Sequence, residues 1–345
     1  MQVLSFPQLH VWAVLTVRGK NGERQEQGAV MKDGFGRRVT YLRLSVTERC
    51  NLRCRYCMPA EGICKKRHED MMTEEETIRA VRAAASLGIS KVRITGGEPL
   101  VKKNILSICE NTAAVPGIRQ VCMTTNGTLL AGMAGPLKEA GVARLNLSLD
   151  TLDRERYRSM TRVGSLDDAL EGLEAALSAG FEQVKINAVL IGGFNDEEIP
   201  ALAALTKDYP ADVRFIELMP MGTEFGETAY LPCDTVLERL PELRPEEPDG
   251  GVARLYRLPG AKGRVGLISP VSSHFCGSCS RLRLTADGKV KPCLHSPAEY
   301  GIRGLDEEGM RQVMLQAIQA KPRQHDPLWE GQGSRAGRTM NQIGG

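Results

Sequence analysis

The chain has 345 residues and a mass of 37.7 kDa, and its 45 Lys and Arg residues against 42 Asp and Glu residues give a net charge of +3. An apolar fraction of 42% with 25% charged residues is ordinary for a globular protein, and it excludes collagen-like and intrinsically disordered chains. The near-neutral charge balance provides no basic footprint for nucleic acid, so we expect no nucleic-acid partner.

No membrane or export segment is expected. The longest apolar runs, such as Val11–Val17, are far shorter than the ~20 residues that a membrane-spanning helix needs. The first 17 residues lack the basic start and the small-residue cleavage site of a secretory signal. We therefore expect a cytoplasmic protein without a membrane partner.

Ten cysteines are too few for a disulfide scaffold in a chain of this length. Six of them form two groups of three, Cys50, Cys54 and Cys57 in the first group and Cys276, Cys279 and Cys293 in the second. The other four are scattered, at Cys64, Cys109, Cys122 and Cys233. In a chain without an export signal, grouped cysteines indicate metal binding or catalysis in a reducing compartment.

The chain divides into three parts. Residues 1–30 hold a short apolar stretch and a polar run without a period, and we expect this extension to be dispensable. In residues 31–218, predicted strands alternate with helices. Residues 219–345 lose that period and hold a short helix near Cys233–Leu240, a strand at Ala253–Leu258 and a last helix near Asp306–Ala320.

Six strands alternating with helices are predicted in the middle part. The strands are Tyr41–Thr47, Lys91–Thr95, Gln120–Thr125, Arg144–Asp150, Val184–Val189 and Asp212–Glu217. The helices are Thr73–Leu87, Ile105–Ala114, Leu129–Ala140, Asp167–Ala179 and Glu197–Tyr209. This α/β order predicts a parallel sheet with right-handed crossovers, either a flat doubly wound sheet or an open (β/α)6 partial TIM barrel.

The two faces of the strands distinguish these arrangements. In Tyr41–Thr47 one face carries Leu42 and Leu44 and the other carries Arg43 and Ser45, and later strands repeat this alternation. A flat parallel sheet with helices on both sides should be apolar on both faces. A polar or cationic face favours the lumen of an open barrel that holds a polar ligand. An antiparallel sheet with one wet face is the alternative, and the alternating helices argue against it.

The first cysteine group, Cys50, Cys54 and Cys57, directly follows the first strand, at the end where α/β folds build active sites. Three cysteines without a fourth leave one iron of a four-iron cluster open to bind substrate or cofactor. A structural zinc site with Cys64 or His68 as the fourth ligand is the alternative, but the paired cysteine knuckles typical of zinc are missing.

The spacing Cys-x3-Cys-x2-Cys, with Tyr56 before the last cysteine, resembles the radical S-adenosylmethionine (SAM) enzymes. Gly96-Gly97-Glu98-Pro99 after the second strand resembles their methionine-binding motif. Two glycines let the backbone approach a ligand closely, and Glu98 supplies an acceptor for an ammonium group. The resemblance implies that the open iron binds SAM and that one electron splits it into methionine and a 5′-deoxyadenosyl radical.

The second cysteine group, at residues 276–293, again lacks a fourth cysteine, and a second cluster with one open iron is our interpretation. A zinc site completed by His274 or His295 is the alternative. Arg281 and Arg283 lie between these cysteines, and paired guanidinium groups beside a metal suit phosphate oxygens. Solvated surface charge is the ordinary role of arginine and the alternative here.

Further stretches resemble one family within this superfamily, the GTP 3′,8-cyclases of molybdenum cofactor biosynthesis. They are Tyr41–Thr47, Cys50–Pro59, Arg93–Leu100, Thr124–Gly127, Asn146–Asp150, Arg214–Met219, the second cysteine group and the terminal Gly344-Gly345. The resemblance implies a radical SAM core, an open partial barrel, at residues 31–218. It also implies a C-terminal extension with an auxiliary cluster at residues 219–345.

The resemblance further implies a role for individual residues. Each cysteine group would hold one 4Fe–4S cluster. SAM would contact Tyr56, Gly97, Ser148 and Met219, and GTP would contact Arg43, Arg93, Thr124, Lys185, Arg281 and Arg283. The catalytic residues would be Arg281, Arg283, Gly344 and Gly345. Five of the six GTP residues are cationic, which suits a triphosphate.

In this family the deoxyadenosyl radical takes the hydrogen from C3′ of GTP, and the resulting radical attacks C8 of guanine. The resemblance therefore implies SAM and GTP as ligands and a reduced flavodoxin or ferredoxin as electron donor. It also implies a partner, cyclic pyranopterin monophosphate synthase, that converts the product. The tail Gly344-Gly345 would reach into the active site, whereas a frayed chain end is the ordinary alternative.

The stretch Met31–Arg37 resembles the usual start of the family, which agrees with an added segment at residues 1–30. Two alternatives stay open. A radical SAM enzyme that modifies a peptide, with an auxiliary Fe–S cluster for electron transfer, would use the same chemistry but bind no GTP. A zinc-binding scaffold would contain zinc and no iron. The sequence also leaves the oligomeric state open, with a homodimer among the options.

Overall fold

The computed structural model of the chain describes residues 30–63, 66–221, 224–329 and 333–344, so most of the predicted extension, residues 1–29, lies outside it. These ranges form one twelve-stranded sheet in the order β12-β11-β10-β1-β2-β3-β4-β5-β6-β9-β8-β7. Its middle six strands pair in parallel and follow one another in chain order. They are β1 (Tyr41–Ser45), β2 (Lys91–Thr95), β3 (Gln120–Thr125), β4 (Val142–Ser148), β5 (Gln183–Leu190) and β6 (Ala211–Glu217).

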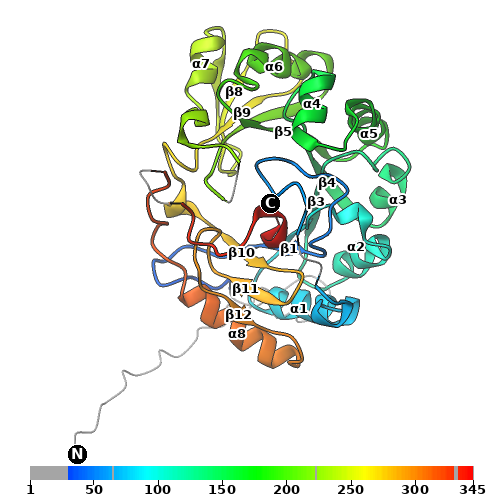
Figure 1. The fold of residues 1–345 in the computed structure, drawn as a ribbon. Helices are drawn as coiled ribbons and strands as arrows, with labels where there is room; N and C mark the ends of the chain where they lie inside the picture. The colour runs from blue at the N-terminus through cyan, green and yellow to red at the C-terminus, as the bar shows by residue number, and fades with distance from the viewer. Residues whose placement is uncertain (1–29, 64–65, 222–223, 330–332, 345) are drawn as a thin grey trace, which may run out of the picture.

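Six helices lie outside these strands, which curve into an open ring (Figure 1). They are α1 (Glu74–Ser86), α2 (Ile105–Ala113), α3 (Ala134–Glu139), α4 (Arg154–Thr161), α5 (Leu166–Ser178) and α6 (Ile199–Asp208). The outward strand residues, such as Leu42, Leu44, Val92 and Ile94, are buried with the helices in one hydrophobic core. The predicted open (β/α)6 partial barrel is therefore confirmed.

The C-terminal region extends the sheet at both edges. β10 (Arg281–Leu284) pairs in parallel with β1, and β9 (Val265–Ile268) pairs in parallel with β6. Antiparallel strands continue each edge, β11 (Lys289–Lys291) and β12 (Tyr300–Gly301) beyond β10, and β8 (Arg254–Arg257) and β7 (Arg244–Glu246) beyond β9. The remaining helices are α7 (Thr235–Arg239), α8 (Glu307–Gln319) and α9 (Met340–Ile343), with short 3-10 turns at His68–Asp70, Pro99–Val101, Asp196–Glu198, Glu227–Ala229 and Cys276–Ser278.

Some predicted elements are corrected. α3 begins at Ala134 and not at Leu129, because Pro136 lacks an N–H and fits only the first turn of a helix. α4 was not predicted, since only three of its eight residues are buried and its apolar period is weak. The strands β9 to β12 and the helix α9 have two to four residues each, too few for a periodic pattern.

The register of the sheet gathers polar side chains on the inner face of the ring, which we call the lumen. Arg283 of β10, Arg43 of β1 and Arg93 of β2 occupy aligned positions, and neighbours aligned in a parallel sheet point to the same side. Asn146 of β4 is likewise aligned with Lys185 of β5. The polar face predicted from alternation is therefore the lumen face.

The same register places the two cysteine groups at opposite ends of the lumen. Cys50 lies five residues after the end of β1, whereas Cys279 lies two residues before the start of the parallel neighbour β10. Any ligand in the lumen thus lies between the two groups. No helix within the described ranges is long and apolar enough to cross a membrane.

Candidate functional site

The first cysteine loop lies beyond the carboxyl end of β1. Its backbone folds back on itself, since the N–H of Cys57 donates to the carbonyl of Cys54 at 2.9 Å. The sulfur of Cys50 accepts from the N–H of Leu52 at 3.3 Å and lies 3.9 Å from the side-chain amide of Asn126. All three cysteines are free and half-buried, so the loop presents three sulfurs within one short segment.

The surroundings of this loop disfavour bare thiolates. Burial raises the pKa of Cys50 to about 11 and that of Cys57 to about 12, and it raises the pKa of Cys54 well above its usual range. The nearby carboxylates of Glu98 and Asp150 act in the same direction. A positively charged iron centre would offset this penalty, so the donor set fits an iron–sulfur cluster.

Gly96 and Gly97 let the loop after β2 pack directly on the first cysteine loop. The N–H of Gly97 donates to the carbonyl of Thr47 at 2.8 Å. A Cβ on Gly97 would overlap the carbonyl oxygen of Arg49, and one on Gly96 would lie 2.6 Å from that of Thr47. The close approach that these glycines permit is therefore between two segments of backbone, and it fixes the cysteine loop.

The carboxylate of Glu98 accepts three hydrogen bonds from groups of the protein itself. It accepts from the hydroxyl of Thr125 at 2.7 Å, from the N–H of Asn126 at 2.7 Å and from the N–H of Leu100 at 3.0 Å. Burial raises the pKa of Glu98 to about 7, against the effect of these donors. The acceptor predicted for an ammonium group thus ties the loop after β2 to the end of β3.

Tyr56 and Asp150 form a buried pair beside the first cysteine loop. The Tyr56 hydroxyl donates to Oδ2 of Asp150 at 2.9 Å, and the N–H of Val189 donates to Oδ1 at 2.9 Å. Burial raises the pKa of Asp150 to about 6 and raises that of Tyr56 well above its usual range. The pair holds the aromatic ring at the carboxyl ends of β4 and β5.

The row Arg283, Arg43 and Arg93 concentrates positive charge in the lumen. Burial and the charges of Arg43 and Arg281 lower the pKa of Arg283 to about 9. Burial also lowers the pKa of Arg43 to about 10, although Tyr41 opposes this effect. Like charges held together away from water are stabilised by an anion, so the row points to an anionic ligand.

Tyr41 fixes one member of this row. Its hydroxyl oxygen accepts from Nε of Arg93 at 2.6 Å, and Nη1 of Arg93 donates to the carbonyl of Met123 at 2.9 Å. Although burial opposes it, the charges of Arg93 and Arg43 lower the pKa of Tyr41 to about 8. The guanidinium plane of Arg93 is thus held in place before any ligand binds.

The other side of the lumen carries Lys185 on β5 and Arg214 on β6. Nζ of Lys185 lies 3.5 Å from Asp212 and 3.6 Å from Asp249. Burial and the charge of Arg214 lower the pKa of Lys185 to about 8. Within the described residues, three buried polar atoms of this face have no hydrogen-bond partner: Nε of Arg214, Oγ1 of Thr124 and Oδ1 of Asn187. Such atoms indicate a place for a polar ligand.

The second cysteine loop is held by a buried lysine. Nζ of Lys321 donates to the carbonyls of Arg281 at 2.7 Å and Pro292 at 2.8 Å, and it lies 3.9 Å from the sulfur of Cys279. Although burial opposes it, the charges of Lys321 and Arg281 lower the pKa of Cys279. Cys279 therefore favours a thiolate, whereas burial raises the pKa of Cys276 in the same loop.

Arg37 fastens the segment before β1 to the second cysteine loop. Its Nη1 donates to the carbonyl of Cys276 at 2.7 Å and its Nη2 to that of Pro322 at 2.7 Å. The carboxylate of Asp33 pairs with Nε of Arg37 at 2.5 Å. The chain from about Met31 onward thus helps to hold the second cysteine loop in place.

The histidines near the second cysteine loop pack on one another. The rings of His274 and His295 lie 5.3 Å and 4.8 Å from that of His325. Nδ1 of His295 is 3.0 Å from Oγ of Ser334, and burial lowers the pKa of His295 to about 3. Among the described side chains, no three His, Cys, Asp or Glu gather closely enough to hold one metal ion. Cysteines of a 4Fe–4S cluster need not converge on one point, since each binds a different iron.

The C-terminal helix α9 lies inside the ring (Figure 1). The carbonyl of Gly344 accepts from Nη1 of Arg283 at 3.0 Å. Gly344 has a φ of +86°, and a Cβ there would overlap Oγ1 of Thr95 and lie 3.1 Å from Cβ of Ser45. Only glycine fits between β1 and β2 at this point. Gly345 lies outside the described residues.

Comparisons with known proteins fit this geometry. Residues 44–206 match the Radical SAM superfamily, and residues 211–327 match Molybdenum Cofactor Synthesis C. A GTP 3′,8-cyclase of Alkaliphilus oremlandii (strain OhILAs) is 48% identical over 323 residues, which cover 91% of this chain and 100% of the relative. A GTP 3′,8-cyclase of Moorella thermoacetica is 46% identical over 326 residues, with the same coverage. The chain belongs to the GTP 3′,8-cyclase family. It is a radical SAM enzyme, and SAM and an iron–sulfur cluster are its cofactors.

Solved structures of more distant proteins share the fold. SuiB of Streptococcus suis bound to S-adenosylmethionine has a TM-score of 0.56 at 16% identity, covering 84% of this chain and 66% of that one. The tagged protein anSMEcpe with bound AdoMet also has a TM-score of 0.56 at 16% identity, covering 82% and 78%. At this identity the likeness supports the fold alone, the open barrel of radical SAM proteins.

The structure places the residues expected from the GTP 3′,8-cyclase family around the lumen. Thr124 and Ser148 lie at the carboxyl ends of β3 and β4. Met219 packs against the cluster that contains Ile343 of α9. Arg281 lies with its guanidinium carbon 5.0 Å from the ring centre of Phe275, beside the second cysteine loop.

Sequence reasoning did not assign a role to Tyr41, Arg214, Lys321 or Arg37. Alternation along β1 and β6 places Tyr41 and Arg214 on the lumen face, so that pattern could have found them. Lys321 and Arg37 contact residues about 30 to 240 positions away in the chain, and no local pattern marks them.

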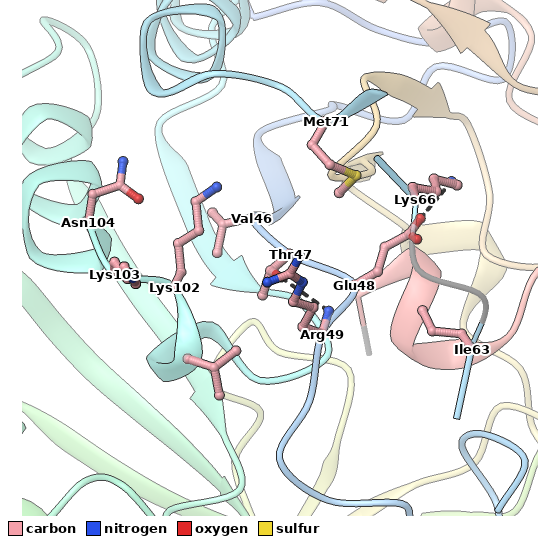
Figure 2. A pocket seen from close by; sticks show the side chains of 11 residues that line it. Val46, Thr47, Glu48, Arg49, Ile63, Lys66, Met71, Lys102, Lys103 and Asn104 are labelled. Atoms are coloured by element: carbon pink, nitrogen blue, oxygen red, sulfur yellow. Dashed lines mark hydrogen bonds and ion pairs between the residues drawn. The ribbon is translucent and has the colours of Figure 1, made fainter. Parts of the chain in front are cut away.

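A cavity of about 370 Å³ lies between the loop after β1, the residues Ile63, Lys66 and Met71, and the segment after the 3-10 turn Pro99–Val101 (Figure 2). Arg49, Lys66, Lys102 and Lys103 line it. Lys66 alone of these four forms an ion pair within the described part of the chain, with Glu48 at 2.7 Å and Asp287 at 2.6 Å. Figure 2 shows Lys66 and Glu48 pointing toward each other.

Proposed function

We propose that this protein converts GTP to (8S)-3′,8-cyclo-7,8-dihydroguanosine 5′-triphosphate, the first step of molybdenum cofactor biosynthesis. The activity named for its relatives supports this reaction. The structural observation that carries the proposal is the buried row Arg283, Arg43 and Arg93, since three guanidinium groups at aligned positions suit a triphosphate.

We infer that two 4Fe–4S clusters bind, one at each cysteine group. Three thiolates in each group leave one iron without a protein ligand. SAM would lie at the first group, against Tyr56, Gly97, Ser148 and Met219. When bound there, SAM and the reduced cluster supply the deoxyadenosyl radical that removes the hydrogen from C3′ of GTP. The guanine base would lie at the second group.

The lumen side chains bind and orient the nucleotide in this proposal. Arg283 and Arg43 donate to phosphate oxygens, and Arg93 is kept in position for the same purpose by Tyr41. Lys185 adds a fourth cation, already balanced in part by Asp212. Thr124 and Arg281 complete the proposed GTP contacts.

The C-terminal tail takes part by orienting Arg283. The Gly344 carbonyl accepts one N–H of this guanidinium, which leaves the remaining donors for the substrate. Gly344 also packs closely against Ser45 and Thr95, the last residues of β1 and β2. We propose that Gly345, the next residue, takes part in catalysis together with Gly344.

Anaerobically reconstituted protein with dithionite, SAM and GTP tests the proposal directly. Mass spectrometry would follow 5′-deoxyadenosine and the 3′,8-cyclised nucleotide. We expect the two products to appear together and to depend on GTP. Deoxyadenosine without consumption of GTP would support a radical SAM enzyme with another substrate, such as a peptide. Neither product, with zinc bound in place of iron, would leave only a zinc-binding scaffold.

The chemistry of the reaction defines its partners. Reduction of the first cluster needs a one-electron donor, and we propose a flavodoxin or ferredoxin. The product is a cyclised nucleotide that a cyclic pyranopterin monophosphate synthase would convert. We propose a cytoplasmic location, because reduced electron donors and unpaired cysteines belong to a reducing compartment. Light scattering of the purified protein would decide between a monomer and a homodimer.

We propose that residues 1–30 are an addition and that residues 31–218 and 219–345 act as core and auxiliary-cluster region. Arg37 already contacts the second cysteine loop, so the framework needs the chain from about Met31 onward. A variant that starts at Met31 should retain the full rate of GTP cyclisation. Loss of activity in that variant, with normal iron content, would contradict the proposal.

A further inference from the structure

A network of buried charges surrounds Arg338, two residues before α9. Its guanidinium donates to both carboxylate oxygens of Glu299, at 2.6 and 2.7 Å, and to both of Asp287, at 3.1 and 3.0 Å. Nη1 also lies 3.5 Å from Glu48. The side chain of Arg338 is 12% exposed and those of Glu48 and Asp287 are 4% and 11% exposed, so water screens these pairs only weakly.

Two lysines complete the network. Nζ of Lys66 lies 2.7 Å from Glu48 (Figure 2) and 2.6 Å from Asp287. Nζ of Lys291, fully buried, lies 3.1 Å from Glu299. Three cations and three carboxylates therefore balance one another, and removal of one member leaves buried charges unpaired.

The members of this network come from both cysteine loops. Glu48 lies two residues before Cys50, and Asp287 and Glu299 lie six residues before and six residues after Cys293. Arg338 belongs to the tail. The network therefore joins the tail to the segments that hold the two cysteine groups.

The helix that follows Arg338 makes ordered contacts up to Gly344. Thr339 and Gln342 form a capping box at its start. The side-chain amide of Asn341, which is buried, donates to the carbonyl of Glu48 at 3.1 Å. Burial and Cys50 raise the pKa of Cys57, and the N–H of Asn341 acts in the opposite direction. The tail thus reaches the first cysteine loop as well as the lumen.

We propose that Arg338 is a positioning residue of this enzyme, which fastens the C-terminal tail so that Gly344 meets Arg283 and Asn341 meets the first cysteine loop. The inference rests on the proposed function, since it assigns the tail's task in that reaction. Only arginine can donate in pairs to two carboxylates at once, because its five N–H groups lie in one plane. A lysine keeps the charge but not this fork.

Hydrogen–deuterium exchange of the reconstituted protein tests the fastening itself. The variants are Arg338→Ala and Arg338→Lys, with Arg335→Ala as the matched control. Arg335 lies in the same segment and pairs only with Asp326 within the described chain, on the surface. We expect the peptide that contains α9 to exchange at least about ten-fold faster in Arg338→Ala, to a smaller extent in Arg338→Lys, and at the unchanged rate in Arg335→Ala.

A second readout separates positioning from general stability. In Arg338→Ala we expect more 5′-deoxyadenosine per cyclised nucleotide, because radical formation no longer meets a correctly held substrate, while the KM for SAM stays unchanged. The electron paramagnetic resonance spectrum of the reduced first cluster should also change, since Asn341 leaves Cys57. Arg335→Ala should match the unaltered protein in both measurements.

Three results would overturn the inference. Unchanged exchange of α9 in Arg338→Ala would show that the network does not hold the tail. Equally faster exchange in α8 and β10 would show a general structural role. If Arg338→Lys and Arg338→Ala both formed the same amount of 5′-deoxyadenosine per cyclised nucleotide as the unaltered protein, the position of the tail would not matter for the reaction. The two exchange results do not depend on the proposed substrate, because exchange of the tail can be measured even if the protein fails to cyclise GTP, whereas the product ratio does depend on it.

Discussion

The two cysteine loops differ in their electrostatic surroundings. In the first, burial raises the pKa of Cys50 to about 11, although Arg53, which donates to the Cys50 carbonyl at 2.8 Å, opposes this effect. The second lies among cations, where Lys321 and two arginines lower the pKa of Cys279 against the effect of burial. The cations beside Cys279 therefore outweigh its burial, whereas burial outweighs the arginine beside Cys50.

This difference suits two tasks. At the first loop Cys50, Cys54 and Cys57 would hold a cluster whose open iron would take the carboxylate and the amine of SAM. At the second loop Arg281, Arg283 and Lys321 are already present and continue into the cationic row of the lumen. That end of the lumen suits a polyanionic nucleotide. The comparison teaches that the residues around the cysteines, more than their spacing, separate the two roles.

The largest expected effect is the loss of one cysteine group. The two variants replace Cys50, Cys54 and Cys57, or Cys276, Cys279 and Cys293, by alanine. Both should keep about half of the iron, because each group holds one cluster. The first variant should form no 5′-deoxyadenosine, whereas the second should form it only at the slow rate that the unaltered protein shows without GTP, and should yield no cyclised nucleotide. Iron analysis and mass spectrometry check this. Identical behaviour of the two variants would remove the division of roles.

Gly97→Ala tests how the first loop is held. The added methyl group would overlap the carbonyl of Arg49, so the cysteine loop must shift, at a cost of about 1–3 kcal/mol in unfolding free energy. We expect SAM cleavage to fall about ten-fold or more, measured as 5′-deoxyadenosine per minute. Gly132→Ala is the control, since a Cβ there meets nothing within 4 Å. Normal cleavage by Gly97→Ala would contradict the packing role.

Lys321→Met tests the cations of the second loop. The change leaves the carbonyls of Arg281 and Pro292 without their donor, which costs about 1–3 kcal/mol for each buried group. Chemical unfolding should show this loss, and GTP binding should weaken while SAM cleavage at saturating GTP stays unchanged. Lys207→Met, at an exposed position on α6, should change neither. Equal effects of the two variants would show that Lys321 has no particular role in holding the second cysteine loop or in binding GTP.

The pH dependence of GTP binding tests the lumen. Burial and Arg214 lower the pKa of Lys185 to about 8, so the free protein loses this charge as the pH rises through that value. A bound polyanion favours the protonated amine, and therefore affinity should fall above pH ~8, by up to about ten-fold per unit. Isothermal titration at several pH values checks this. Lys185→Arg should make the profile less steep, although Tyr41 and Arg283 still titrate near pH 8 and 9, and an unchanged profile would contradict the assignment.

The smallest effect is expected for Tyr56→Phe. The variant removes the hydroxyl that donates to Asp150 at 2.9 Å, and Asp150 keeps the N–H of Val189. We expect a loss of about 1 kcal/mol in unfolding free energy and a modest rise in the KM for SAM. Thermal unfolding and initial rates measure both. A loss of SAM cleavage comparable to that of Gly97→Ala would show a larger role for the hydroxyl.

The middle part of the fold was predictable because its strands and helices are long enough to show a period. β2 and β3 lie at their predicted bounds, and the alternation along β1 identified the lumen face. β9 and β10 were not predicted, because four residues carry no period and their partners β6 and β1 lie far away in the sequence.

The candidate site was predictable where it consists of local motifs. The cysteine groups and the cationic face of the strands follow from spacing and alternation, whereas Gly97 and the assignment of the cations to GTP came from the family resemblance. Arg37, Lys321 and Arg338 could not be found in this way, since each acts on carbonyls or carboxylates that folding brings from another segment. The predicted use of Glu98 also differs, because three donors from its own loop and the end of β3 occupy its carboxylate.

The division of roles between the two cysteine loops is tested most directly by equilibrium binding of GTP under anaerobic conditions. The reconstituted protein and the two triple-alanine variants would be compared at the same ionic strength. We expect GTP to bind to the unaltered protein and to the variant without the first group, and to be lost or strongly weakened without the second. The division would be contradicted if the variant without the first group lost GTP binding and the variant without the second group retained it.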